Sequence, residues 1–410
     1  MHPFDHLGAE IATAWSGSGY APEALPPIAA DALRRADLSA RLDPLVMVRR
    51  FLGEDHPPTQ RDIPFGEPQL ALFVHPRFVI EALFWVDGAP AIHDHGLRGA
   101  FTVLSGSSVH AVYRFDGEDV GSPDLRVGHT ELIRLEKLVP GDVRAIDRDL
   151  THGVFHIERP SVSIVVRANV PYYLQYQYEP PHVASRRRNG DSTLDKKIAA
   201  LRMLADTNQP GWMHALESFL DNAYPYAAYR ALVALADYFD DVEGTSRELL
   251  SGRWPALAEP LAQSLTDAMW RGDLFARRAH HTRADHRFFL GLLHYATCRQ
   301  QILDVVAQHS RLPPERQIAI WLRELAESSP SDTLQFLDVA LDLSGPLLAP
   351  FGPLAPLAVI TSLEGIIGGR STDEVAAELS ATLGASLQQA SALPRCLAGL
   401  HRSTLRPLLA

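Results

Sequence analysis

The stretch that decides the fold is GAPAIHDHGLRGAFTVLSG, residues 88–106, in which His93 and His95 are separated by one residue beside a strand-like run. Alternate side chains of a β-strand share a face, so we expect both imidazoles to point into one barrel. A third histidine, His152, begins another β-rich segment in VPGDVRAIDRDLTHGVFHI, residues 139–157. Two ligands from one strand and one from a distant strand make a triangular face on a metal ion. The spacing therefore predicts a three-histidine metal site.

Short β-branched and aromatic runs surround these histidines from about residue 69 to residue 178. Examples are QLALFVH, FVIEALFW, SVHAVYRF and SVSIVVRANV, separated by turn signals such as VDG, SGS, FDG and VPGD. Many short strands with no helical pattern between them indicate an antiparallel sandwich or barrel. We assign residues 67–180 to this β-barrel.

The flanking regions have a helical texture. Residues 1–66 mix helix-favouring pieces with proline-rich breaks and predict a helical N-terminal lead-in. The polar, basic residues 181–193 read as an interdomain linker, and residues 194–410 show apolar side chains at three- and four-residue spacing. The predicted fold class is therefore α+β and multidomain, with a β-barrel followed by an all-α domain through which a homo-oligomer would form.

Composition excludes several classes of function. The chain has 410 residues, of which 46% are hydrophobic, and a formal net charge of −11, without the basic footprint of a nucleic-acid binder. Its two cysteines are too few for a disulfide framework and suit a reducing compartment. No apolar run reaches the roughly 20 residues that a membrane span needs, and the N-terminus lacks a signal-peptide pattern. These features predict a cytoplasmic protein with no nucleic-acid or membrane partner.

The paired histidine segments resemble the two cupin motifs, and in detail they are similar to those of the thiol dioxygenases, of which cysteine dioxygenase is the best known. The resemblance covers about residues 70–170. RFVIEALFW, followed eight residues after Trp85 by the His-Asp-His triplet, is similar to that family's strand and metal-binding turn, and PGD…TH resembles the second motif. The resemblance implies a jelly-roll cupin barrel, with His93, His95 and His152 as the metal ligands.

The metal is expected to be iron(II), with zinc, nickel or manganese as alternatives. Many cupins place a glutamate three or four residues after the second histidine, but here Arg98 and Gly99 occupy those places. A neutral three-histidine face leaves the metal its full charge and up to three open positions, enough for a chelating substrate and dioxygen. We therefore expect an iron-dependent dioxygenase acting on a small molecule, with specialised metabolism as one setting for it. A non-oxidative isomerase or lyase, or a ligand-binding or sensing barrel without catalysis, stays open as an alternative.

The strand after the third ligand departs from the thiol dioxygenases. That family has serine, histidine and tyrosine at alternate positions, where VSIVVR places Ser163, Val165 and Arg167. The family's cross-linking cysteine would fall near Gly99, so oxidation of free cysteine is not expected. Strand parity aims Arg167 into the barrel, where it is expected to bind an anionic group of the substrate or an internal carboxylate, unless a local bulge turns the side chain to solvent. Together with His156, Ser163 and Arg167 are the candidate catalytic residues.

His156 lies four residues beyond His152 and shares its parity. It is expected to act as an outer hydrogen-bonding group or an acid–base residue, or else to be a core histidine. Asp94 should point to the opposite face and be structural. His110 and Tyr113, three apart on one expected strand, lie on opposite faces, so at most one enters the barrel. Further along, the histidines of the helical region do not have the usual di-iron spacing and are expected to be solvated or capping residues: His280, His281, His286 and His294.

Overall fold

The computed structural model describes residues 3–54, 57–60, 66–88, 91–169, 175–186, 192–327, 355–383 and 404–410. The chain forms two compact units, residues 1–269 and residues 270–410. The first unit holds every described strand as well as helices, and the described part of the second is helical. The α+β class predicted from the sequence is confirmed. The boundary between the units lies inside the stretch that the sequence assigns to one helical domain.

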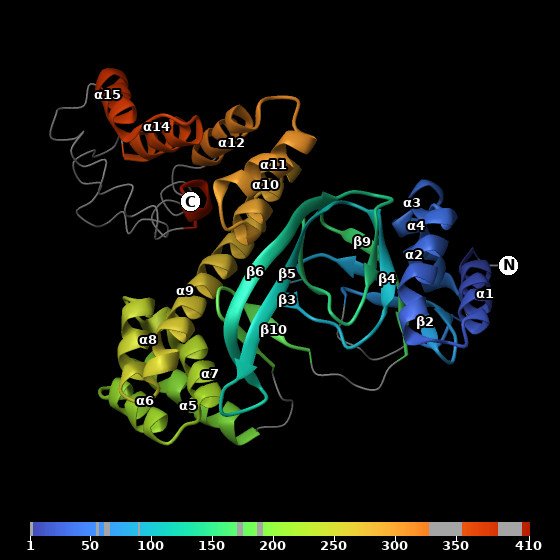
Figure 1. Cartoon of the computed structure of the whole chain (residues 1–410), viewed down its shortest axis with the longest axis horizontal. Helices are drawn as coiled ribbons and strands as arrows, with labels where there is room; N and C mark the ends of the chain where they lie inside the picture. Colours follow the sequence, from blue (N-terminus) through green and yellow to red (C-terminus); the bar gives the residue numbers. More distant parts are fainter. Residues whose placement is uncertain are drawn as a thin grey trace. The chain divides into compact units, whose positions relative to one another are not determined.

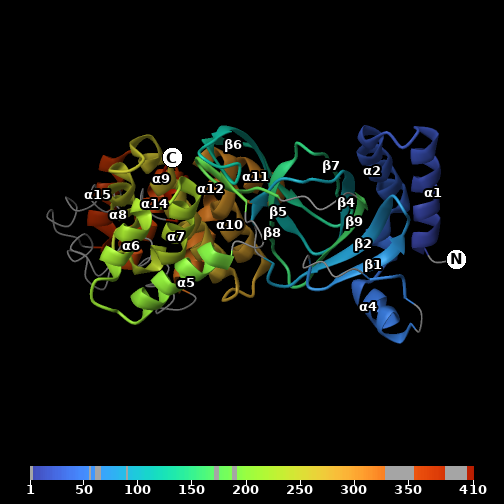
Figure 2. The same cartoon turned by 90° about the horizontal axis from the view of Figure 1, so that it is seen from below.

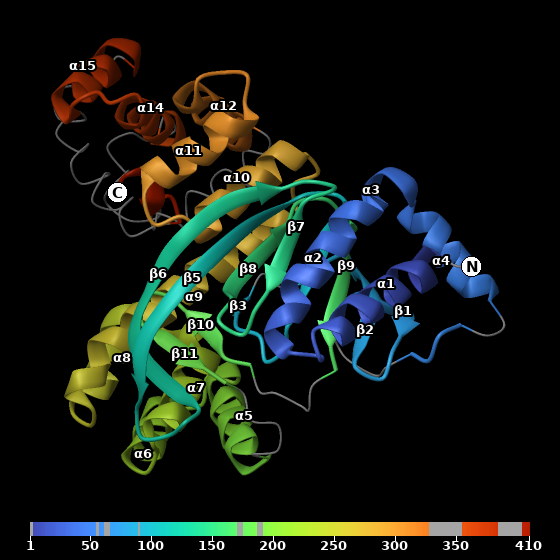
Figure 3. The same cartoon turned by 45° about the vertical axis from the view of Figure 1, so that its right-hand side comes forward.

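The strands of the first unit form two antiparallel sheets. The strands are β1 (Gln69–Val74), β2 (Phe78–Trp85), β3 (Ile92–His93), β4 (Gly99–Ser105), β5 (Ser108–Asp119), β6 (Leu125–Leu138), β7 (Val143–Ile146), β8 (Thr151–His156), β9 (Ser161–Ala168), β10 (Gln177–Glu179) and β11 (Val183–Ser185). One sheet has the order β1-β2-β9-β4-β7, and the other closes on itself in the order β10-β11-β6-β5-β8-β3. The long β5 and β6 make a curved hairpin (Figure 3).

The helices precede and follow the strands. They are α1 (Pro3–Gly17), α2 (Leu25–Ala36), α3 (Leu38–Arg41), α4 (Pro44–Gly53), α5 (Ser192–Asp206), α6 (Trp212–Asp221), α7 (Pro225–Leu235), α8 (Val242–Ser251), α9 (Pro255–Arg278), α10 (Ala284–Tyr295), α11 (Arg299–His309), α12 (Pro314–Glu327), α14 (Ala355–Ile367) and α15 (Thr372–Leu383) (Figure 1). Short 3₁₀ turns lie at Pro22–Ala24, Ala236–Tyr238 and Arg406–Leu408. Among the described helices, none combines the length and apolar character needed to cross a membrane.

The five-stranded sheet has two buried faces, and β2 shows why its sequence is almost continuously apolar. Phe78, Ile80, Ala82 and Phe84 belong to the core that α1 and α2 complete, whereas Leu83 packs in a second cluster on the opposite face. Figure 2 shows α1 and α2 lying against this sheet. Because side chains alternate along a strand, one run of apolar residues supplies both cores. The helical lead-in thus covers the outer face and leaves the inner face to the barrel interior.

The closed sheet is joined to the following helices. Leu125 of β6 and Val183 of β11 are fully buried in a core with residues of α5 to α9. β11 lies within residues 181–193, which read as a linker in the sequence, and it pairs with both β6 and β10. The described part of that segment is therefore built into the barrel. Helix α5 begins at Ser192, after residues that lie outside the described part of the chain.

Candidate metal centre

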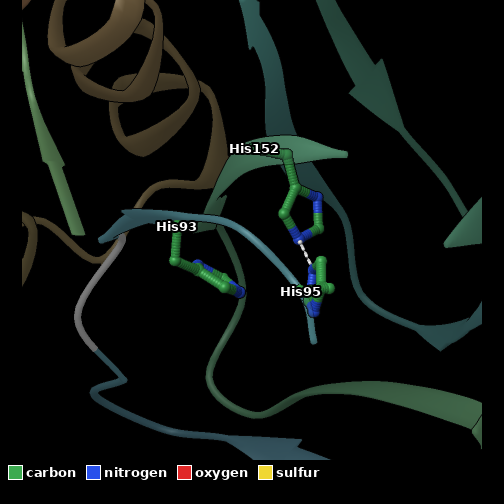
Figure 4. A group of neighbouring side chains, drawn as sticks. All are labelled: His93, His95 and His152. Atoms are coloured by element: carbon green, nitrogen blue, oxygen red, sulfur yellow. Dashed lines mark hydrogen bonds between the residues drawn. The ribbon is translucent and has the colours of Figure 1, made fainter. Parts of the chain in front are cut away.

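His93, His95 and His152 come together at one end of the closed sheet. β3 and β8 are adjacent antiparallel strands, and His93 and His152 are direct cross-strand partners. β3 ends at His93, so His95 reaches the cluster from the residues after the strand and not, as the sequence suggested, from the same strand. Figure 4 shows the three imidazole rings turned toward one another. The three predicted ligands therefore form one group.

The triangle that they form has the dimensions of a metal site. Ring centroids are 4.8 Å apart for His93–His95, 5.0 Å for His93–His152 and 4.8 Å for His95–His152. One ligand nitrogen from each ring lies within 4.8 Å of the others, and the Nε2 atoms of His95 and His152 are 2.8 Å apart. These two Nε2 atoms are joined by a hydrogen bond (Figure 4), and metal–nitrogen bonds of about 2.1 Å would place them roughly 3.0–3.4 Å apart.

His93 supplies a second indication that the cluster is built for an ion. Its Nδ1 lies 3.0 Å from the carbonyl oxygen of Ala91, which orients the ring. Its Nε2 is buried and has no hydrogen-bond partner among the described residues. A buried polar atom without a partner costs roughly 1–3 kcal/mol. An ion held by Nε2 of His93, together with the other two Nε2 atoms, removes that cost.

The three ligands are held in the neutral form that metal binding requires. Burial lowers the pKa of His93, and the hydrogen bond to Ala91 opposes this only in part. Burial, and then the neighbouring His93 and His110, hold the pKa of His95 well below its usual 6.5. The pKa of His152 is likewise held well below 6.5, by burial and then by His95, His93 and His110. At neutral pH none of the three rings therefore carries the second proton that a metal ion would have to displace.

A chain of polar side chains continues outward from His152. Nε2 of His110 on β5 lies 2.8 Å from Nδ1 of His152, and Nδ1 of His110 lies 2.9 Å from Oε1 of Glu136 on β6. Arg144 donates two hydrogen bonds to Glu136, at 2.7 Å and 3.0 Å. Of His110 and Tyr113, His110 is thus the residue that joins the histidine cluster. Sequence reasoning missed Glu136 and Arg144, because only the register of β5 on β6 and the fold of β7 bring them here.

An apolar cluster lies beside the histidines in the barrel. The ring centroid of Phe101 is 6.2 Å from that of His152 and 6.1 Å from that of His110. Phe101 belongs to a cluster whose buried members are Leu83, Phe101, Val103, Leu138, Ile146 and Val165. These side chains exclude water from one side of the site, which strengthens electrostatic interactions there.

Ser163 and Arg167 lie where strand parity places them, on the face of β9 that carries Val165. Ser163 is buried. The guanidinium of Arg167 donates to both carboxylate oxygens of Glu81, at 2.5 Å and 2.9 Å, and the Glu81 side chain is only 1% exposed. An internal carboxylate is therefore the partner of Arg167, which is one of the alternatives that the sequence left open. A role in binding substrate stays a prediction.

Two further polar residues near the histidine cluster, His156 and Asp94, have defined contacts. His156 is buried and stacks on Trp85, with ring centroids 4.9 Å apart and planes at 13°. Asp94 accepts hydrogen bonds from the Tyr176 backbone N–H at 2.9 Å and from the Tyr178 hydroxyl at 3.3 Å. Asp94 thus holds the segment leading into β10 against the metal-binding turn, as its opposite parity predicted. The acid–base role of His156 stays a prediction.

Gly99 marks a close approach between strands. A Cβ at this position would lie 1.9 Å from the carbonyl oxygen of Val166 on β9. No side chain fits there without moving the backbone of one strand. The position that resembles the cross-linking cysteine of the thiol dioxygenases is therefore closed to any such residue.

A second group of possible metal ligands lies in the unit formed by residues 270–410. Asp285, His286 and Glu324 also bring three ligand atoms within 4.8 Å of one another. Arg283, however, donates to both oxygens of Asp285, at 3.0 Å and 2.5 Å, and lies 3.0 Å from Glu324. Nε2 of His286 lies 3.1 Å from the same glutamate oxygen. The guanidinium of Arg283 therefore already pairs with both carboxylates of this cluster.

The prediction that the histidines of this region are solvated or capping residues is wrong for two of them. His286 is 4% exposed and His294 is 5% exposed. Nδ1 of His294 lies 3.0 Å from the carbonyl oxygen of Arg271. Helix α10 is buried from His286 to Tyr295, which its sequence periodicity did not reveal. His280, in contrast, is exposed.

No known protein-family model matches this chain, and no curated protein matches it either.

Proposed function

We propose that the protein is a mononuclear non-heme iron(II) oxygenase that acts on a small molecule with dioxygen, in a cupin-type barrel. The observation that carries this proposal is the meeting of His93, His95 and His152, a ligand group that contains three imidazoles and no carboxylate. Imidazole nitrogen suits iron, zinc, copper and nickel, whereas magnesium and calcium need oxygen ligands. Among these metals, iron is favoured by the resemblance of the two histidine segments to those of the thiol dioxygenases.

When bound, iron(II) would supply a site at which substrate and dioxygen meet, and three neutral ligands would leave it up to three open positions. Three residues of this chain would bind the iron and fix its position. His93, His95 and His152 present Nε2 atoms to one point, while Phe101 and its apolar neighbours exclude water from the adjoining interior. These features support a site in which a reactive species would be shielded from solvent.

The resemblance to the thiol dioxygenases supports the barrel type and the ligand set, and the departures argue for another substrate. Val165 and Arg167 replace the histidine and tyrosine of that family, and Gly99 has no room for the cross-linking cysteine. Arg167 is engaged by Glu81 and is largely buried, so a substrate anion would have to share this pair. We therefore propose a substrate other than free cysteine.

The experiment that tests this function combines metal analysis with oxygen uptake. Protein purified without oxygen should contain one iron per chain, and candidate thiols, amino acids and phenols should be screened in an oxygen electrode. His152→Ala should lose both the iron and the uptake. Full occupancy by zinc with no oxygen uptake would instead favour a non-oxidative isomerase or lyase. A metal-free protein that still binds a ligand tightly would favour a sensing role.

A further inference from the structure

We infer that Glu136, acting through His110, fixes the tautomer of His152, so that the Nε2 lone pair of His152 faces the other two histidines. Its consequence for metal affinity rests on the proposed function, but the tautomer itself is a property of the metal-free chain. Glu136 and His110 are positioning residues in this proposal, because they act on the site only through His152.

The geometry places the three groups in one line across neighbouring strands. His152 is on β8, His110 on β5 and Glu136 on β6, and His110 and Glu136 are direct cross-strand partners. Both imidazoles are buried, at 5% and 0% exposure, and the two nitrogen contacts measure 2.8 Å and 2.9 Å. Buried polar networks of this kind hold their members in single orientations.

The direction of each hydrogen bond follows from the carboxylate at the outer end. An ionised Glu136 can only accept, so Nδ1 of His110 must carry the proton and donate it. The other nitrogen of a neutral His110 is then an acceptor, which requires Nδ1 of His152 to be the N–H donor. A neutral His152 with its proton on Nδ1 has its lone pair on Nε2, 2.8 Å from Nε2 of His95.

Three arginine contacts keep Glu136 ionised and in place. Arg144 binds both of its oxygens, and Nε of Arg134 lies 3.2 Å from Oε1. Burial acts to raise the pKa of Glu136, but the hydrogen bonds from His110 and Arg144 outweigh it and lower that pKa to about 2. The Glu136 carboxylate therefore stays ionised, and accepts the hydrogen bond from His110, at every pH at which the protein would be used.

In this protein one more residue stands between the histidine and its carboxylate than is usual at metal sites. Metal-binding histidines commonly donate their second N–H to a carboxylate or carbonyl, which fixes the tautomer and raises ligand basicity. His93 uses the Ala91 carbonyl directly, whereas His152 reaches its carboxylate through a second imidazole. The barrel thereby places the negative charge of Glu136 away from the metal face while keeping its effect on the ligand.

The tautomer is tested by nitrogen-15 NMR of histidine-labelled, metal-free protein, with the His152 signals identified by their loss from His152→Ala. The wild type should show a protonated Nδ1 and an unprotonated Nε2. His110→Leu removes the acceptor and should give a mixture of tautomers, while His110→Gln restores an acceptor oxygen and should return the wild-type signals. A protonated Nε2 in the wild type, or unchanged signals in His110→Leu, would overturn the inference.

Manganese(II) binding, followed by electron paramagnetic resonance of the free ion, gives the second readout. His110→Leu and Glu136→Gln should weaken binding about 10- to 100-fold, as outer partners of metal ligands do. Glu131→Gln is the matched control, since Glu131 lies on the same strand and pairs with the exposed Arg114. Affinities within twofold of wild type in both variants would contradict the inferred consequence. Absence of binding in the wild type would contradict the proposed function, while the NMR result would still decide the tautomer.

Thermal unfolding separates this role from a general loss of structure. If His110→Leu does not fold, Glu136→Leu keeps the inference testable, and its melting temperature shows whether it is folded. Leucine offers Nδ1 of His110 no acceptor, whereas the amide oxygen of glutamine can still accept that hydrogen bond. The His152 signals should therefore become a mixture of tautomers in Glu136→Leu and stay closer to those of the wild type in Glu136→Gln. Unchanged wild-type signals in a folded Glu136→Leu protein would overturn the inference.

Discussion

Two clusters in this chain place three potential ligand atoms within 4.8 Å of one another, and they differ in what already fills them. The cluster of His93, His95 and His152 has a buried Nε2 without a partner among the described residues. In the cluster of Asp285, His286 and Glu324, the guanidinium of Arg283 is hydrogen-bonded to Asp285 and paired with Glu324. Distance alone does not distinguish them. The positive charge does, because an arginine supplies the acidic cluster with what a metal would supply.

The same comparison explains Arg167. It binds Glu81 with two hydrogen bonds, as Arg283 binds Asp285, so both arginines complete acidic groups. Arg283 and Arg167 thus satisfy the carboxylates beside them, whereas the three imidazoles of the barrel are a group that could hold a cation.

Arg167→Met should have the largest effect on stability. It leaves the carboxylate of Glu81 buried without its partner, which costs about 3–5 kcal/mol of unfolding free energy. The double variant Arg167→Met with Glu81→Leu should recover most of that loss, and metal content should be unchanged in both. Urea unfolding with metal analysis checks this. A stable single variant with a raised Michaelis constant would instead assign Arg167 to the substrate.

His95→Ala should weaken manganese(II) binding by about 100- to 1,000-fold, since each ligand of a protein metal site contributes roughly 3–4 kcal/mol. The matched variant in the other cluster, His286→Ala, should retain the wild-type affinity and stoichiometry. Isothermal titration of the two purified variants measures both values. Equal losses in the two proteins would remove the distinction between the clusters.

Arg283→Met should convert the acidic cluster into a weak cation site. With the guanidinium gone, Asp285 and Glu324 keep two negative charges beside His286, and manganese(II) should bind with a dissociation constant of about 10⁻³ M. Wild-type protein should show only the barrel site at the same concentrations. No second site in this variant would mean that the arginine is not what keeps the metal out.

The smallest effect concerns pH. His95 and His152 have folded-state pKa values well below 6.5, whereas the unfolded chain binds their protons near pH 6.5. Stability of the metal-free protein is therefore fully present above pH 6.5 and is lost as pH falls below it, by about 1 kcal/mol per histidine at pH 5.5. Urea unfolding should show a shallower loss in His95→Leu. The exposed His214 is the control, and His214→Leu should keep the wild-type slope.

The sequence predicted part of the candidate site, and the remaining contacts depend on interactions that local sequence patterns do not encode. Spacing and the resemblance to the cupin motifs pointed to the three histidines that the structure brings into one group, because the residues around His93 and His152 carry strand and turn signals. Alternation along β9 also placed Arg167 on the inner face. The partner of Arg167 depends on the register of β9 on β2, which no local pattern encodes.

Other features depend on contacts between distant strands. Glu136 lies in the charged run ELIRLEKL and looks like any solvated residue until β5 pairs with β6. His286 is buried because other helices of its unit cover α10, and a single helix carries no signal for that. The sequence did not determine the register between distant strands or the packing of helices, because neither follows from local propensity.

The central claim is that the three histidines, and not the acidic cluster, hold the metal. Anomalous diffraction at the iron absorption edge, from crystals loaded with iron(II) without oxygen, tests it most directly. We predict one strong peak per chain, bonded to the Nε2 atoms of His93, His95 and His152. A peak at Asp285, His286 and Glu324 in its place, or no peak at the histidines, would contradict the account.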